Sequence, residues 1–432
     1  MTDLTLPEIT IPPVLAPSEP PAWDGAVWVG ELWTDTLELT DSQARYHLQQ
    51  ADGFGRARLL VRNDRGPLGF VELDVVDRSV DVDVLRRMVA ALPDPAPAPA
   101  PAWRTPSITV VICTRDRVSM LQTALDSVRA VDYPDVEIIV VDNAAATDAT
   151  GRYVASLQDP RVRVIEEPRP GLSRARNTGM LAAAGEVVAF TDDDVVVDRH
   201  WLTATARGFA RADEVWCVSG LVPGAELRTP AQAYFDARVG WSSGLRTRVF
   251  DCAAPPSDIP LFPFAVGHYG TGANFAVDRR AVLDLGGFDE ALGAGSPSGG
   301  GEDLDIFFRI LHGGGRLVYD PASVVWHRHR ASGEGLAAQS YTYGVGLGAW
   351  IAKIAGNRRT APKAFGTALL RGPAFLKYVA DSAETSRPTD DLAHLLPEGL
   401  STPAWRSVLA GARAYRAGLR EGRHPRPLVG LT

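Results

Sequence analysis

Between residues 107 and 191, short apolar runs alternate with longer stretches in which apolar residues recur every three or four positions. The runs predict strands at Ser107–Cys113, Val136–Val141, Arg161–Ile165 and Glu186–Thr191, and the longer stretches predict helices near 118–130, 147–157 and 173–184. Strands and helices that alternate over short connections are typical of a parallel sheet covered on both faces. We therefore predict an α/β domain with its ligands outside the carboxyl ends of the strands.

The pattern on either side of this region differs and indicates further domains. Strand-like runs at Val27–Trp33, Arg56–Arg62 and Pro67–Val76, with a helix at Val82–Leu92, predict a small β-rich domain. An alternating Pro/Ala run predicts an extended spacer. We expect a disordered Pro-rich N-terminus (1–22), the β-rich domain (23–92), the spacer (93–106), the α/β domain (107–330) and a helical C-terminal region (331–432).

The charge of the 432-residue chain is unevenly distributed. Residues 1–330 hold 31 Lys+Arg against 45 Asp+Glu, whereas residues 331–432 hold 13 against 7. The basic C-terminal region predicts peripheral contact with an anionic membrane, and a solvated arginine-rich face is the alternative. Within it, Trp405 and Leu409 share one helical face and Arg406, Arg413 and Arg420 another, which is consistent with an interfacial helix. A helix packed on the main domain is the favoured interpretation.

Other compositional features predict the compartment and exclude some chemistry. The N-terminus lacks the basic and apolar blocks of a signal peptide, and the three cysteines form no metal-type pair or disulfide framework. We expect a cytoplasmic protein, peripheral at the inner face of the membrane, with no nucleic-acid partner. The only lysines are Lys353, Lys363 and Lys377, so the chain lacks a Walker-A lysine and offers no Schiff-base lysine before residue 353.

Acidic side chains gather where the predicted strands end. Three carboxylates, Asp192, Asp193 and Asp194, follow an apolar strand directly, and adjacent carboxylates repel unless a cation is present. Asp192 and Asp194 are two residues apart and predict a Mg²⁺ or Mn²⁺ site, although an acidic turn that caps the following helix is the alternative. Asp116 and Asp142 end two other strands and suit a base or ribose edge, or else cap helices and turns.

Two further positions carry candidate chemistry. Glu302 and Asp303 follow Gly299–Gly301, a stretch whose mobile backbone suits a loop that closes over substrate. An acid there can serve as a general base or as a helix cap. His327 ends another apolar run and predicts a third metal ligand, although a lone histidine is usually structural.

These residues lie in an ordered series of motifs that resembles the family 2 glycosyltransferases, which are nucleotide-sugar enzymes of the GT-A fold. The motifs are Val110–Arg117, Glu137–Asn143, Gly171–Gly179, Phe190–Asp194, Gly272–Phe275, Gly287–Glu290 and Gly301–Asp305. Each motif alone is weak evidence, but their order and spacing together make the resemblance strong. It covers about Pro106 to Arg330.

The resemblance implies roles by position. It assigns Thr114, Arg115, Asp116 and Asp142 to the nucleotide, Arg176 and Asn177 to the segment that lines the nucleotide-sugar, and Asp192 and Asp193 to the donor side of a D-x-D motif. It assigns Asp194, Asp192 and His327 to a divalent metal, Asp303 to the general base, and Glu302, Gly272 and Asn274 to the acceptor. One departure is Ala144-Ala145-Ala146, where relatives carry serine or glycine, so no side-chain contact to the nucleotide is expected from that turn.

The implied function is an inverting glycosyltransferase that moves a sugar from a nucleotide-diphosphate donor to a hydroxyl of a glycan, a lipid-linked acceptor or a small molecule, with Mn²⁺ or Mg²⁺ as cofactor. A sugar-1-phosphate nucleotidyltransferase would share the topology, but those enzymes resemble one another in a downstream lysine that is missing before residue 353. A catalytically degenerate nucleotide-sugar scaffold or sensor is the non-enzymatic alternative. The intact acids at 192–194 and 302–303 argue against it.

Overall fold

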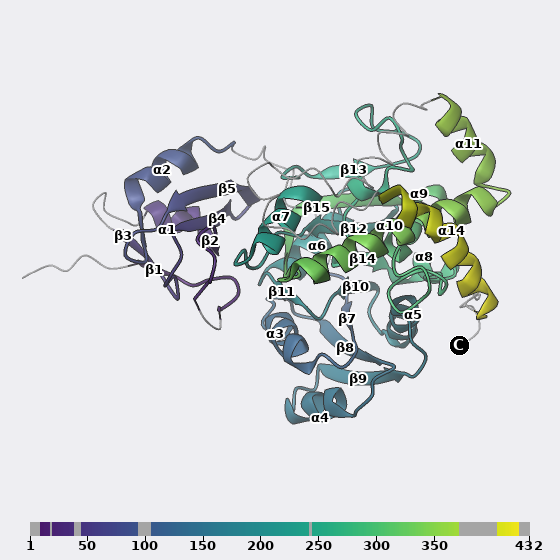
Figure 1. Cartoon of the computed structure of the whole chain (residues 1–432), viewed down its shortest axis with the longest axis horizontal. Coiled ribbons are helices and arrows are strands. Elements are labelled where there is room, and N and C mark those ends of the chain that lie inside the picture. The colour runs from purple at the N-terminus through teal and green to yellow at the C-terminus, as the bar shows by residue number, and fades with distance from the viewer. Residues whose placement is uncertain are drawn as a thin grey trace, which may run out of the picture.

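The computed structural model describes residues 9–17, 20–38, 45–93, 105–241, 244–370 and 404–422. A small N-terminal unit lies beside a larger α/β domain, and the C-terminal helices α11 (Ala361–Leu370) and α14 (Ala404–Arg420) lie at the far end of that domain (Figure 1). The predicted Pro/Ala spacer falls largely on residues 94–104, which lie outside the described residues.

The N-terminal unit contains two three-stranded sheets, with strand orders β1-β3-β6 and β2-β4-β5. Its elements are β1 (Ile9–Ile11), β2 (Val27–Trp33), α1 (Thr34–Glu38), β3 (Arg45–Leu48), β4 (Arg56–Asn63), β5 (Gly66–Asp74), β6 (Ser79–Asp81) and α2 (Val82–Ala90). Strands β4 and β5 pair in an antiparallel hairpin, and the buried Trp28, Tyr46 and Leu59 belong to the core of the unit. Within residues 1–22, for which the sequence predicted a disordered or extended chain, Ile9–Ile11 form the extended strand β1, which pairs in parallel with β3 and buries the Ile11 side chain.

The larger domain contains a nine-stranded sheet with helices on both faces (Figure 1). Its strands are β7 (Ile108–Thr114), β8 (Val136–Asn143), β9 (Val162–Glu167), β10 (Val187–Thr191), β11 (Val195–Val197), β12 (Val215–Leu221), β13 (Arg248–Phe250), β14 (Asn274–Asp278) and β15 (Arg316–His327). Its helices are α3 (Val118–Arg129), α4 (Ala149–Ser156), α5 (Leu172–Ala182), α6 (Trp201–Phe209), α7 (Pro230–Val239), the 3₁₀ turn η1 (Val266–His268), α8 (Arg279–Asp284) and α9 (Glu302–His312).

The strand order is β11-β15-β12-β14-β10-β7-β8-β9, with β13 paired to β15. Strands β10, β7, β8 and β9 run parallel, and β14 is antiparallel to both β10 and β12. The carboxyl ends of β7, β8 and β10 therefore meet at one edge of the sheet, as the alternating pattern predicted. The α/β fold class inferred from the sequence is confirmed.

Alternation along β7 explains why helices cover both faces. Val110 and Ile112 pack in one apolar cluster with Leu121 and Leu125 of α3. Val111 faces the other way, into a second cluster with residues of α5 such as Met180. A strand buried on both faces must be apolar at nearly every position, so polar side chains are confined to its end.

The C-terminal region contains α10 (Gly333–Gly356), α11 (Ala361–Leu370) and α14 (Ala404–Arg420). Helix α14 packs on α10 at glycines: a Cβ added to Gly348 would lie 1.9 Å from the Val408 carbonyl oxygen, and one added to Gly411 would lie 2.3 Å from the Ala349 nitrogen. The G-x-G-x-x-A sequence at 344–349 thus lies within a helix and serves helix packing. Among the described residues, no helix combines the length and the apolar character that crossing a bilayer requires.

An apolar cluster joins the N-terminal unit to the larger domain. Val27, Val29 and Leu60 of the unit share it with Leu221 and Trp326 of the sheet, among others. The backbone N–H of Val27 also donates to the carbonyl of Leu227 (2.9 Å). The unit therefore packs directly on the domain.

Candidate active site

The acidic triplet lies where β10 ends, beside the end of β15. One ligand atom from each of Asp192, Asp194 and His327 can be chosen so that all three atoms lie within 4.8 Å of one another. Two carboxylates and one imidazole suit Mn²⁺ or Mg²⁺, which complete their coordination with phosphate oxygens and water. The donor set therefore fits the divalent metal that the sequence predicted.

Arg117, which had no predicted role, holds the triplet in place. Its guanidinium donates to Asp193 Oδ1 (2.6 Å) and to Asp194 Oδ2 (2.8 Å), and Thr114 donates from Oγ1 to Asp193 Oδ2 (2.7 Å). Burial raises the pKa of Asp193 to about 6 despite Arg117. Burial would also raise the pKa of Asp194, but the charge of His327 and the hydrogen bonds from His327 and Arg117 lower it far below its usual range. Asp194 therefore stays ionised.

Arg176 joins the metal-binding end of the site to the Glu302-Asp303 motif. Its side chain is 2 % exposed, with Nη1 3.0 Å from Glu302 Oε1 and Nη2 3.5 Å from Asp192 Oδ1. Nη2 also donates to the carbonyl of Gly272 (2.9 Å). Burial and the nearby Asp303 raise the pKa of Glu302 to about 7, against the opposing charge of Arg176. Arg176 is thus the buried counter-ion of two acids.

Asp303 and Glu302 begin α9 but have different surroundings. Asp303 is partly exposed, and its Oδ2 accepts from the backbone N–H of Gly272 (3.1 Å). Glu302 is buried and its Oε1 is engaged by Arg176. The preceding glycine loop packs on α10, since a Cβ on Gly301 would lie 2.6 Å from the Gly346 carbonyl oxygen. Of the two acids, Asp303 has the carboxylate that is more accessible to an acceptor.

The ends of β7 and β8 present the predicted nucleotide-binding residues. Asp142 is 6 % exposed, and its Oδ1 has no hydrogen-bond partner among the described residues. Burial raises its pKa, opposed by a hydrogen bond from Thr150. Asp116 is exposed, and its Oδ1 accepts from the Ala146 N–H (2.9 Å). Arg115 is exposed to solvent.

Two residues of the predicted site are engaged elsewhere. The Asn177 amide donates to the Phe288 carbonyl (2.9 Å) and accepts from the Phe288 N–H (2.8 Å). The Asn274 amide donates to the carbonyls of Leu221 (3.0 Å) and Ser323 (2.8 Å), and its oxygen accepts from the Trp201 indole (2.9 Å). Both side chains are buried, so the structure does not bring their polar groups into the site. Their role is to tie backbone segments together.

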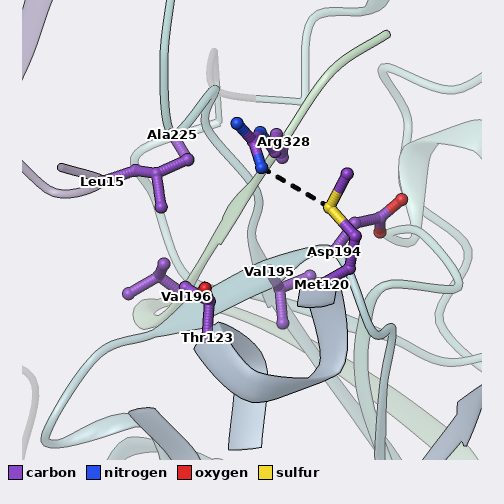
Figure 2. Close-up of a pocket in the computed structure, with 8 residues that line it drawn as sticks. All are labelled: Leu15, Met120, Thr123, Asp194, Val195, Val196, Ala225 and Arg328. Carbon is purple, nitrogen blue, oxygen red and sulfur yellow. Dashed lines mark hydrogen bonds between the residues drawn. The ribbon is translucent and has the colours of Figure 1, made fainter. Parts of the chain in front are cut away.

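A small pocket lies next to Asp194. Its lining is mainly apolar and includes Leu15 of the N-terminal segment, Val195 and Ala225, with Asp194 at one side (Figure 2). Arg328 reaches across it to the Met120 sulfur (3.5 Å), as the dashed line in Figure 2 marks. The pocket lacks Asp192, His327 and Asp303, so it does not correspond to the predicted donor site.

Comparison with known proteins identifies the domain that carries this site. A pre-mycofactocin glycosyltransferase of Mycobacterium tuberculosis (strain ATCC 25618 / H37Rv) is 29% identical over 55% of this chain, and the match covers 46% of that protein. The succinoglycan biosynthesis protein ExoO of Rhizobium meliloti (strain 1021) is 38% identical over 53% of this chain and 63% of its own length. The chain thus spans between about half and two thirds of these relatives.

A solved mannosyltransferase structure from Pyrobaculum calidifontis, in complex with GDP-Man and Mn²⁺, aligns with a TM-score of 0.45 and 22% identity over 78% of this chain and 91% of that one. The model of the family described as "Glycosyl transferase family 2" matches residues 109–270. That range contains the ends of β7, β8 and β10 and the acidic triplet. Residues 109–270 are therefore similar to glycosyltransferase family 2.

Proposed function

We propose that this protein is an inverting, metal-dependent glycosyltransferase that moves a sugar from a nucleotide-diphosphate donor to a hydroxyl acceptor. The observation that carries the proposal is the connection between the two acidic groups. Arg176 contacts Asp192 on the metal side and Glu302 on the other, and Gly272 contacts both Arg176 and Asp303. One site thus combines a metal-binding cluster with a nearby general base.

The residues support a single displacement at the anomeric carbon. A divalent ion bound by Asp192, Asp194 and His327 would offset the charge of the diphosphate as it leaves. Asp303 would take the proton of the acceptor hydroxyl on the opposite face of the sugar. The Gly272 N–H already orients its Oδ2. One displacement inverts the anomeric configuration, so no carboxylate nucleophile is required.

We assign the nucleotide to the ends of β7 and β8. Among the described residues, nothing donates a hydrogen bond to the buried Oδ1 of Asp142, and leaving such an acceptor unpaired costs about 1–3 kcal/mol. A base N–H or a ribose hydroxyl would satisfy it. Asp116 lies at the neighbouring strand end and can take part, while its hydrogen bond from Ala146 fixes the turn that carries the three alanines.

Asp303→Asn tests the proposal. The variant should keep donor and Mn²⁺ binding but lose at least about 100-fold in transfer rate, since a general base contributes about 10²–10⁴-fold. The assay is the release of nucleoside diphosphate from a panel of nucleotide-sugars, with sugar hydrolysis as the readout when no acceptor is known. The exposed Asp284 gives the matched control, since Asp284→Asn should leave the rate unchanged. Wild-type rates in Asp303→Asn would remove it as the base.

The alternative is a nucleotide-sugar scaffold or sensor that binds its ligand without using it. The same assay separates the two functions. A scaffold would show metal-dependent stabilisation by a nucleotide-sugar, seen as a higher melting temperature, with no product above that of Asp303→Asn. The partly exposed carboxylate of Asp303 favours the enzyme.

We also propose that α14 contacts an anionic membrane surface. Trp405 is 54% exposed and Leu409 65%, and the Arg406 guanidinium lies 5.6 Å from the Trp405 ring centroid. Exposed apolar side chains next to arginine suit the boundary of anionic lipids. Trp405→Ser with Leu409→Ser should abolish cosedimentation with phosphatidylglycerol vesicles, whereas Val249→Ser, at a side chain 44% exposed on β13, should not. Unchanged cosedimentation would refute this contact.

A further inference from the structure

A continuous line of buried polar groups runs from the N-terminal unit to the metal-binding end of the site. It begins at Arg58 on β4, whose guanidinium contacts Asp236 Oδ2 on α7. Asp236 Oδ1 lies 3.4 Å from His329 Nε2, and His329 Nδ1 lies 3.2 Å from His327 Nδ1. His327 Nε2 in turn lies 3.4 Å from Asp194 Oδ1. Three successive contacts therefore separate the candidate metal ligand His327 from an arginine of another domain.

The ends of this line determine which way its protons point. A carboxylate can only accept, so Asp236 requires the proton of His329 on Nε2. His329 Nδ1 is then an acceptor, and His327 must donate to it from its own Nδ1. Without a metal ion, Nε2 of His327 faces the ionised Asp194 and carries a proton, which a metal ion must displace when it binds there. Asp236 and His329 thus hold the other proton, on Nδ1, which His327 keeps when its Nε2 binds metal.

Packing holds the line rigidly. His329 is 2 % exposed and Asp236 is 7 % exposed. The Phe235 ring meets His329 edge-on at 4.8 Å between centroids, and the Trp241 ring meets His327 at 5.9 Å. Gly224 passes so close that an added Cβ would lie 3.0 Å from Asp236 Oδ1 and 3.1 Å from His329 Nε2. The rings have little room to flip.

The N-terminal unit is anchored next to the same strand. Trp326, which precedes His327, belongs to the apolar cluster shared with β2 and β4. Arg62 lies four residues after Arg58 on β4, and its Nη1 is 2.8 Å from Oδ2 of the buried Asp198. Arg58 is 17% exposed and stacks on Phe70 at 4.3 Å from the ring centroid. The strand that carries Arg58 is therefore held against the larger domain, and this fixes the contact of Arg58 with Asp236.

We infer that His329, Asp236 and Arg58 are positioning residues for the metal ligand His327, and that the N-terminal unit thereby completes the metal site of the larger domain. This inference rests on the proposed metal site. Polar partners behind a ligating histidine typically change metal affinity about 10- to 100-fold. The unit would thus tune metal affinity without touching the metal or the substrate.

The test is Mn²⁺ affinity, measured by calorimetry on the full chain with and without uridine diphosphate. His329→Phe keeps an aromatic ring against Phe235 and removes the acceptor, so Mn²⁺ binding should weaken about 10- to 100-fold. Arg58→Met should weaken it less, with the same sign, and Arg58→Lys should restore most of the loss. Arg56→Met, on the same strand as Arg58, removes an exposed pair with Glu72 of β5 and should leave the Mn²⁺ affinity unchanged.

A second readout separates positioning from general damage. In wild type saturated with Mg²⁺, ¹⁵N chemical shifts should show His327 with its single proton on Nδ1, and in His329→Phe under the same conditions they should show a mixture of forms. Mn²⁺ affinities within twofold of wild type in folded His329→Phe would overturn the inference. If His329→Phe loses its cooperative thermal transition, Asp236→Asn takes its place in the test. A Mn²⁺ affinity within twofold of wild type in folded Asp236→Asn would then overturn the inference. A wild-type protein that binds no Mn²⁺ would instead refute the proposed metal site itself.

Discussion

Removal of the Arg176 charge is the perturbation whose consequence follows most directly from the structure. The substitution Arg176→Met keeps most of the apolar stem among the rings of Phe190, Phe275 and Phe288, whose centroids lie 5.4–5.9 Å from the guanidinium carbon. It removes the ion pair with Glu302 at 3.0 Å and the longer contact with Asp192 at 3.5 Å. Two carboxylates then lose their shared counter-ion.

The magnitude follows from burial. Breaking a buried ion pair by removing one partner costs about 3–5 kcal/mol, because the remaining charge stays desolvated. For a domain of this size that corresponds to roughly 6–20 °C in melting temperature. Glu302 already has a pKa of about 7, so it can escape part of the cost by taking up a proton. The loss should therefore be larger at pH 8 than at pH 6.

The assay is thermal unfolding of the metal-free protein at both pH values, followed through tryptophan fluorescence. A double variant, Arg176→Met with Glu302→Gln, removes one of the orphaned charges and should recover about 1–3 kcal/mol of the loss. Arg152→Ala supplies the control, because its pair with Asp148 is 71% and 72% exposed and is worth less than about 1 kcal/mol.

Two results would refute this reasoning. The first is an Arg176→Met protein that is destabilised no more than Arg152→Ala, which would show that the buried acids are not charged in the folded protein. A double variant as unstable as Arg176→Met would show that Glu302 and Arg176 do not interact, in conflict with the 3.0 Å contact.

Two further predictions concern buried charges away from the site. Glu31 has a pKa raised to about 7 by burial and by Asp198, against Arg62, so the folded state holds its proton more tightly than the unfolded chain between pH 4.5 and 7. The free energy of unfolding should therefore fall by about 3 kcal/mol at most as the pH rises from 4.5 to 7. Glu31→Gln should flatten this pH dependence. Identical pH profiles of unfolding for wild type and Glu31→Gln would contradict the prediction. Lys353 pairs with two buried acids, Asp289 (2.8 Å) and Asp305 (2.7 Å). Lys353→Met should therefore lower the stability by about 3–5 kcal/mol, measured as a lower melting temperature. A decrease no larger than that of Arg152→Ala would contradict this prediction.

Much of the α/β domain was predictable because its strands are buried on both faces and read as apolar runs. The ends of those strands then marked Thr114, Asp142 and the triplet without any knowledge of contacts. Strands β12, β13 and β14 were not predicted. In this region the antiparallel strand β14 lies between β10 and β12, and strands and helices do not alternate regularly along the sequence. The change of strand direction therefore has no signal in the sequence pattern.

The roles of individual side chains were harder to predict than the location of the site. Arg115 and Arg117 are equivalent in the sequence, but Asp116 adopts a left-handed conformation (φ 53°), and in the turn that it forms Arg117 meets Asp193 and Asp194 while Arg115 is exposed. Asn177 and Asn274 stand in site motifs, yet their amides bond to backbone groups far along the chain. A sequence does not show which partner an amide meets.

The contact between His327 and His329 could have been predicted from their spacing in the sequence. Two residues apart on an extended segment, both side chains project to the same side, which makes a histidine pair at the end of a strand a candidate for a ligand and its support. Asp236 and Arg58 had no such signal. They lie 93 and 271 residues from His329 along the chain, and only the packing of the N-terminal unit brings them together.

Metal-dependent nucleotide binding tests the central claim most directly. Uridine and guanosine diphosphates should raise the melting temperature of the wild-type protein in the presence of Mn²⁺ and much less in its absence. Asp194→Asn should lose the Mn²⁺-dependent part, because it removes a ligand that the structure keeps ionised next to His327. Equal Mn²⁺-dependent stabilisation of wild type and Asp194→Asn would contradict the assignment of the acidic triplet to a metal–nucleotide site.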